Sequence, residues 1–220
     1  MSETDIFFSP VEDDFAVNGK TDLQSFQEAG FEKQEVFDRF LTYKRRMARL
    51  GATQAIYLYD MRMLERISEN DNNLFGGKNE KPVDAVGLCQ EIIEFYKDVF
   101  FSPSEYGWNK KNKKIDEDFM FALIDNTINY LPDIDKFIQK HLSGNWTVIK
   151  LDFVLRSIIR CAIAEMLLGV KIEKAVICSE YTNIASNFFN GKEIGFINGI
   201  IDKLYSSVLL AHPFISRKNI

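Results

Sequence analysis

A hydrophobic repeat close to 3.6 residues is the feature that most restricts the fold of this 220-residue chain. The repeat is clearest within residues 147–168, in Val154, Leu155, Ile158, Ile159, Ala162, Ile163 and Met166. Spacings of three and four place apolar side chains on one broad face of an α-helix. We therefore predict a core helix here, with Asp152, Arg156 and Arg160 forming a ladder of charges along its edge.

The same repeat predicts further helices over about 34–68, 83–100, 116–130, 132–143, 171–189 and 193–210. Pro132 suits the first turn of a helix and Gly169 a helix C-cap. Alternation with a period of two never persists, so no strand is predicted. The fold class is therefore all-α, with about seven helices.

The domain organisation follows from where this pattern begins and ends. Residues 1–33 show no sustained period and are predicted to be a flexible acidic arm, with a short helix near 21–29. Residues 34–212 form the helical domain, and residues 213–220 form a C-terminal tail. The N-terminus lacks the charged and apolar regions of a signal peptide, and no apolar run reaches 18 residues. We therefore expect a cytoplasmic protein without a membrane span.

The sequence favours binding over catalysis. Cys89, Cys161 and Cys178 form no Cys-x-x-Cys pair, which is typical of free, buried thiols. His141 and His212 are isolated, which disfavours a zinc site. Nucleophile and nucleotide-binding motifs are missing. We therefore expect no enzyme, no catalytic or metal-binding residue and no cofactor.

Charge is distributed unevenly along the chain. Residues 1–40 hold ten acidic and three basic residues, a net charge of −7, whereas the remainder carries +2 and the whole chain −5. The isoelectric point near 5.2 argues against a nucleic-acid partner, but this uneven distribution weakens that argument.

One helical stretch combines basic residues with an exposed aromatic position. Within residues 43–60, the basic residues are Lys44, Arg45, Arg46 and Arg49. At 100° per residue, Arg46, Arg49 and Tyr57 share an outer face, opposite an inner face of small residues such as Ala48 and Ala55. Guanidinium groups bind phosphate and Tyr can stack on an unpaired base. The alternatives are a solvated face with an incidental Tyr and, less favoured, a membrane-surface helix.

These residues resemble a family. "RRMARLGATQAIY" resembles the N-terminal arginine motif of the NusB family of bacterial transcription antitermination factors. "DFVLRSIIRCAIAEML" resembles a second motif of the family, and "VICSEYTNIASNFFNGKEIGFINGIIDKL" resembles its C-terminal motif. The resemblance covers about residues 40–210. The chain departs from the family pattern at Met47, Ala164 and Ser179, where Arg, Tyr and Asn are usual.

The resemblance implies a fold of two small helical bundles packed together. It also implies function in transcription antitermination and termination, through binding of single-stranded boxA RNA together with the ribosomal protein NusE. This assembly tethers the RNA to RNA polymerase in the antitermination complex during rRNA transcription. The implied RNA-binding residues are Lys44, Arg45, Arg46, Arg49, Tyr57 and Phe196. If three or four basic residues contact phosphates, log K should fall against log salt with a slope of about −2 to −3.

The "GFINGIIDKL" stretch contains Asn-Gly, which usually marks a hairpin, but its flanks are helical. In the implied fold this stretch is the final helix. We expect Gly199 to permit close approach of another helix, Asn198 to bond a neighbouring backbone and Gly195 to lie near the helix start.

Two other functions are possible. Similar domains precede RNA cytosine methyltransferase domains, but this chain shows no Gly-rich cofactor loop and ends at residue 220. The second alternative is a NusB-like protein-interaction module that has lost RNA binding, favoured by Met47 and the acidic arm.

Overall fold

The computed structural model describes residues 16–17, 20–21, 33–72, 83–100, 115–168 and 172–215. Within these ranges lie seven α-helices: α2 (Lys33–Asn72), α3 (Ala85–Phe100), α4 (Glu117–Asn129), α5 (Leu131–His141), α6 (Phe153–Leu167), α7 (Lys174–Ala185) and α8 (Lys192–Ile215). A 3₁₀ turn, η1 (Val148–Lys150), precedes α6. The prediction of an all-α fold with about seven helices is confirmed.

A small hairpin was not predicted. β1 (Ala16–Val17) pairs antiparallel with β2 (Lys20–Thr21). Apart from this hairpin and Lys33, the predicted acidic arm lies outside the described residues. The predicted helix near 21–29, apart from Thr21, also lies outside the described residues, and so does Gly169, the predicted C-cap.

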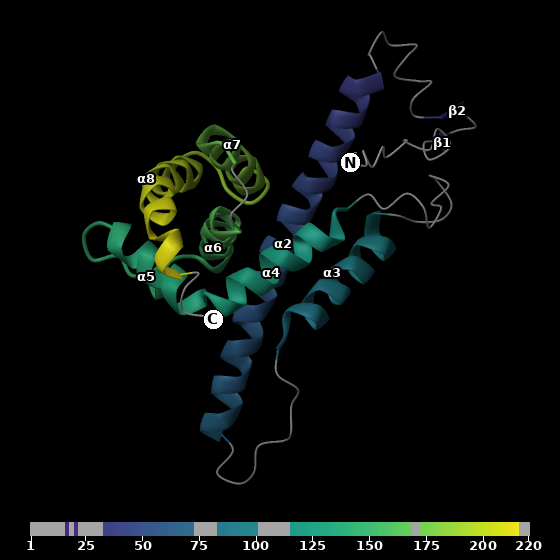
Figure 1. Ribbon diagram of the computed structural model, residues 1–220. Coiled ribbons are helices and arrows are strands. Elements are labelled where there is room, and N and C mark those ends of the chain that lie inside the picture. The colour runs from purple at the N-terminus through teal and green to yellow at the C-terminus, as the bar shows by residue number, and fades with distance from the viewer. Residues whose placement is uncertain are drawn as a thin grey trace, which may run out of the picture.

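The helices form two groups that meet along α2, as Figure 1 shows. Helices α3 and α4 pack against each other and against α2 on one side of the molecule. On the other side, α7 and α8 pack around α6, and α5 contacts α6 and α8. The 40 residues of α2 span about 60 Å at the rise of an α-helix, so this helix extends beyond both groups. Among the described residues, no helix combines the length and apolarity that crossing a bilayer requires.

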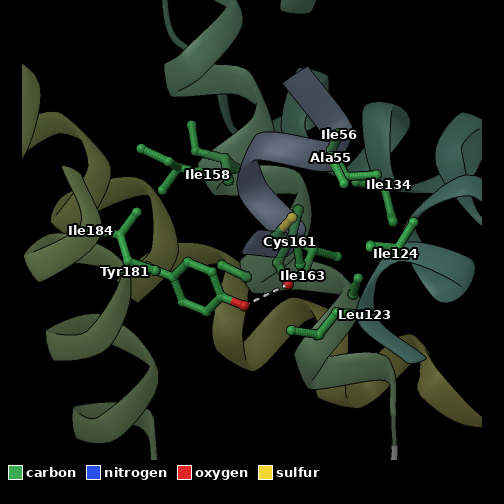
Figure 2. Packing of buried hydrophobic residues seen from close by; sticks show 14 of the residues in the cluster. Ala55, Ile56, Leu123, Ile124, Ile134, Ile158, Cys161, Ile163, Tyr181 and Ile184 are labelled. Carbon is green, nitrogen blue, oxygen red and sulfur yellow. Dashed lines mark hydrogen bonds between the residues drawn. The ribbon is translucent and has the colours of Figure 1, made fainter. Parts of the chain in front are cut away.

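Helix α6 lies at the centre because it contacts both groups. Every residue from Leu155 to Leu167 is buried, which leaves α6 no solvated face. Figure 2 shows Ile158, Cys161 and Ile163 of α6 among apolar side chains of the surrounding helices. The Tyr181 hydroxyl donates a 3.0 Å hydrogen bond to the Cys161 carbonyl oxygen within this core. A helix buried on all sides must also neutralise its charged residues internally.

The predicted charge ladder on α6 is wrong. The Asp152 carboxylate is the N-cap and accepts hydrogen bonds from the amides of Val154 and Leu155 at 2.8 and 3.2 Å. Arg156 and Arg160 are both buried and pair with residues of other helices rather than with Asp152. The i, i+4 spacing suggested local pairs, but burial on every side of α6 directs both guanidinium groups to its neighbours.

The close helix contact occurs at a different glycine from the predicted one. A Cβ at Gly199 would have no atom within 4 Å, and Asn198 is exposed, with no hydrogen bond from its side chain among the described residues. The predicted packing roles of Gly199 and Asn198 are therefore wrong. A Cβ at Gly51 in α2 would lie 2.5 Å from the Met120 Sδ and 3.1 Å from the Ile92 Cγ2. Gly51 is therefore the residue that lets α4 and α3 approach α2.

Two other local predictions are confirmed and one is wrong in part. Pro132 lies in the first turn of α5, and Gly195 lies one turn after the start of α8. Cys89 and Cys161 are free and buried, but Cys178 is partly exposed.

Candidate nucleic-acid interface

One face of α2 packs against the neighbouring helices, so the side chains on the opposite face are the ones exposed to solvent. Ala48, Ala52 and Ala55 are fully buried against the neighbouring helices. On the opposite face, the side chain of Arg46 is 47% exposed and Tyr57 is 39% exposed. The predicted exposure of Arg46 and Tyr57 is therefore confirmed, although their role in RNA binding stays a prediction. The two residues are eleven positions apart, which corresponds to three turns and about 16 Å along α2.

Arg49 is not on the exposed face, which corrects the predicted outer face. It is 4% exposed, and its Nε and Nη2 donate to the two carboxylate oxygens of Glu165 at 2.9 and 2.6 Å. Burial alone lowers the pKa of Arg49, but the hydrogen bonds and charge of Glu165 outweigh it and raise the pKa overall. Its helical position lies at the edge of the outer face, and α6 and α7 cover that edge. Arg49 is thus a buried ion-pair residue rather than an exposed phosphate contact.

Arg46 is held by Glu180 of α7. The Arg46 Nε and Nη2 donate to the two oxygens of Glu180 at 3.1 and 2.8 Å. The hydrogen bonding of Arg46 to Glu180 is the main reason that the pKa of Arg46 is raised. Glu180 is 6% exposed and also accepts a 3.5 Å hydrogen bond from the Arg49 Nη1. Arg46 therefore carries its charge at the rim of a buried network.

Behind Arg46, the network continues into the core. Glu165, which binds Arg49, also accepts a 2.8 Å hydrogen bond from the Tyr181 hydroxyl. Both Glu165 and Tyr181 are fully buried. The chain of contacts therefore runs from Tyr181 through Glu165, Arg49 and Glu180 to Arg46, and it joins α2 to α6 and α7. Exposure increases along this series of contacts, from the buried Tyr181 to Arg46, which is the member that faces solvent.

Arg45 and Lys44 lie where α4 begins. The Lys44 carbonyl oxygen accepts a 3.4 Å hydrogen bond from the Asp116 amide, which fixes the start of α4 beside α2. The Arg45 Nε lies 3.4 Å from the Asp116 Oδ2, and its guanidinium carbon lies 4.7 Å from the centre of the Phe119 ring. The Arg45 side chain is 46% exposed, so this cation–π contact leaves much of its charge in solvent.

Phe196 lies on a different helix from the basic residues. It is 38% exposed on α8, one turn after the start of that helix. Helix α8 packs against α6 and α7 rather than along α2. Among the described residues, no ring contact or hydrogen bond joins Phe196 to the basic residues of α2. Lys44, Arg45 and Arg46 are consecutive on α2, but Arg45 turns toward α4 and Arg46 toward α7. Tyr57 lies farther along the same helix, and Phe196 lies on α8.

A second buried charge network was missed by the sequence analysis. Asp60 of α2 accepts hydrogen bonds from Arg156 at 2.6 and 3.0 Å and from Arg160 at 2.8 and 2.9 Å. Arg160 also donates to both oxygens of Asp135 on α5 at 2.8 and 2.7 Å. No spacing rule could find Asp60, because its partners follow it by about 100 residues. This network is structural and holds α2 and α5 against α6.

The described residues contain no group of three or more His, Cys, Asp or Glu side chains arranged to hold a metal ion. What α2 offers chemically is a set of positive, partly exposed donors near its start and an exposed phenol three turns beyond Arg46. Such groups bind phosphate and stack on bases.

Comparisons with known proteins agree on one family. The sequence model of the NusB family matches residues 46–206. "Transcription antitermination protein NusB" of Rickettsia bellii is 29% identical over 164 residues, covering 73% of this chain and 89% of that protein. The proteins of the same name from Caulobacter vibrioides and Sphingopyxis alaskensis are 28% and 26% identical and are covered over 91% and 93% of their lengths.

Solved structures share the fold. The solved structure described as "T. maritima NusB, P3121, Form 2" matches with a TM-score of 0.51 at 22% identity and covers 74% of this chain and 90% of that chain. The crystal structure of "Antitermination Factors NusB and NusE in complex with dsRNA" matches with a TM-score of 0.52 at 22% identity, covering 74% of this chain and 96% of that chain.

Proposed function

Because this chain belongs to the NusB family, we propose that it is an RNA-binding transcription antitermination factor of the bacterial cytoplasm. It binds single-stranded boxA RNA together with the ribosomal protein NusE. The complex tethers the RNA to RNA polymerase during rRNA transcription. The proposal assigns binding residues only and needs neither a catalytic residue nor a cofactor.

The observation that carries the proposal is the exposed positive edge of α2. Lys44, Arg45 and Arg46 follow one another, and the two arginines have about half of their side chains in solvent. Tyr57 is exposed on the same helix as Arg46. Phosphate contacts supply affinity and register, while an aromatic ring accepts any base in a stack. Phe196 would be a second aromatic contact, contributed by α8.

The comparisons support the same proposal. The relatives carry the name of an antitermination protein, and one structural neighbour was solved with NusE and double-stranded RNA. The family match falls within residues 34–212, which we propose as the binding domain. Residues 1–33 and 213–220 lie outside that match.

A filter-binding assay tests the proposal. Labelled single-stranded boxA RNA is titrated with the full chain, alone and with NusE, over a series of salt concentrations, with a scrambled RNA of equal length as control. Because Arg49 is buried, Lys44, Arg45 and Arg46 remain as the basic residues that can contact phosphate. The slope of log K against log salt should therefore be about −2. Binding without preference for boxA, or with a flat salt response, contradicts the proposal.

A second candidate function is a protein-interaction module without RNA binding. The observation in its favour is that carboxylates pair with all three arginines of the motif, namely Asp116, Glu180 and Glu165. Under this alternative the ion pairs serve only stability. The full chain would then bind NusE without retaining boxA RNA in the same assay.

A further inference from the structure

Glu180 has a role that its burial alone does not explain. It places a carboxylate directly beneath the partly exposed guanidinium of Arg46, on the surface proposed to meet RNA. A carboxylate so close to a phosphate site lowers the local positive potential, which by charge alone weakens RNA binding. The geometry of the Arg46–Glu180 pair, in contrast, favours RNA binding.

The two oxygens of Glu180 bind one edge of the Arg46 fork. Nε and Nη2 donate to Glu180 at 3.1 and 2.8 Å. A guanidinium has five N–H donors in a rigid plane. This side-on contact therefore uses two donors and leaves the end-on edge, formed by one Nη1 hydrogen and the second Nη2 hydrogen, for another acceptor. That edge matches the bidentate geometry of a phosphate.

Glu180 is itself firmly held. Its side chain is 8% exposed, and its Oε2 also accepts from the Arg49 Nη1 at 3.5 Å. Arg49 is fixed by two hydrogen bonds to Glu165, which in turn binds Tyr181. The orientation of Arg46 is thus set from the core outward, through residues that have little freedom to move.

We propose that Glu180 is a positioning residue for RNA binding, which fixes the Arg46 fork with its end-on edge toward an RNA phosphate. This inference rests on the proposed function. A flexible arginine loses side-chain entropy when it binds, so fixing it beforehand raises affinity. Glu180 therefore favours RNA binding although its own charge opposes it.

The test compares Glu180→Gln with Asp116→Asn. Each change removes one negative charge close to a basic residue of the site. Asp116 meets Arg45 through a single 3.4 Å contact, and its Oδ1, which caps α4, has a counterpart in Asn. We expect Glu180→Gln to weaken binding of labelled single-stranded boxA RNA about fivefold or more, the loss of one oriented phosphate contact. Asp116→Asn should bind as tightly as the wild type or tighter.

A double-mutant cycle identifies the route of the effect. If Glu180 acts through Arg46, Glu180→Gln should cause no further loss in an Arg46→Ala background. The salt slope of Glu180→Gln should fall toward that of Arg46→Ala. Equal or tighter binding by Glu180→Gln, an equal loss in Asp116→Asn, or an additive loss in the double variant would each overturn the proposal.

Arg46→Lys keeps the test decisive should Glu180→Gln fail to fold. This change lies on the surface and keeps the charge, but it removes the planar fork. We expect it to weaken binding of boxA RNA about fivefold or more relative to the wild type, and wild-type affinity would overturn the proposal. Failure of the proposed function is distinguishable, because the wild type itself would then not bind boxA RNA, whereas failure of the positioning role leaves wild-type binding intact.

Discussion

Gly51 and Gly199 are two helical glycines whose surroundings differ. Gly51→Ala places a Cβ 2.5 Å from the Met120 Sδ in the core, and overpacking of this kind costs about 1–3 kcal/mol. Gly199→Ala meets no atom within 4 Å, so the helix propensity of Ala should stabilise the protein by about 0.5–1 kcal/mol. Urea denaturation of both variants measures the two changes in the free energy of unfolding.

The signs of these two changes decide whether a helix packs closely against α2 at Gly51 and against α8 at Gly199. If Gly51→Ala is neutral, α4 does not approach α2 as the structure has it. If Gly199→Ala destabilises the protein, the predicted packing role of Gly199, which the structure contradicts, would be restored.

At the scale of the helix, the core around α6 buries two groups that ionise at high pH, the Cys161 thiol of α6 and the Tyr181 phenol of α7. Burial raises the pKa of the Cys161 thiol to about 12 from its usual value near 9, and burial raises the pKa of Tyr181 well above 10. A raised pKa in the folded state means that the stability these groups contribute is complete below pH 9. It is lost as the pH rises toward 12, at up to about 1.4 kcal/mol per pH unit for each group.

We therefore predict that the free energy of unfolding is level between pH 7 and 8.5 and falls between pH 9 and 10.5. Urea denaturation at constant ionic strength measures it. Cys161→Ala should make the decrease in the free energy of unfolding with pH smaller, because the variant lacks one of the two groups whose pKa differs between the folded and unfolded states. A free energy that is the same at pH 7.5 and pH 10.5 would show that neither group is buried as uncharged in the folded protein.

The helices themselves were predictable from the sequence, whereas their charged contacts were not. The spacing of Ala48, Ala52 and Ala55 correctly predicted the buried face of α2, because a period of 3.6 residues reports which side chains share a face. It does not report how far a neighbouring helix wraps around that face. Arg49, at the edge of the outer face, is covered by helices that begin more than 100 residues later.

Asp60, Glu165 and Glu180 illustrate the same limit. Each binds an arginine from another part of the chain, and nothing within one helical turn signals the pairing. Glu165 and Glu180 lie within the two C-terminal motifs that resemble the family, but their position in a motif gives them no role. In the structure they neutralise arginines of α2, and Asp60 neutralises arginines of α6.

For the molecule as a whole, the acidic N-terminal segment precedes the basic edge of α2. Residues 1–40 carry −7. We expect that deletion of residues 1–33 tightens boxA RNA binding at low salt, since this charge competes with phosphate for Lys44, Arg45 and Arg46. Screening should reduce the gain as salt rises, because the Debye length falls to about 8 Å at physiological ionic strength. Filter binding of the two proteins over a salt series checks this, and equal affinities throughout would exclude competition.

The two helical groups and the proposed RNA site share one set of contacts. Arg46 is the exposed end of a network that joins α2 to α6 and α7, so the same ion pairs that hold the fold also hold the site. Arg46→Ala should weaken RNA binding and reduce the salt slope by about one phosphate's share. It should leave NusE binding intact, because the resemblance to the NusB family assigns that contact to other helices.

The central claim is that the exposed face of α2 binds RNA, and Tyr57→Ala tests it most directly. RNA affinity is measured at several salt concentrations beside a thermal melting curve. We predict that affinity for boxA RNA falls by about 1–3 kcal/mol through lost stacking, with the salt slope unchanged. Stability should change by no more than about 0.5 kcal/mol, because Tyr57 is exposed. A variant that unfolds, while each folded molecule binds RNA as the wild type does, would contradict the account.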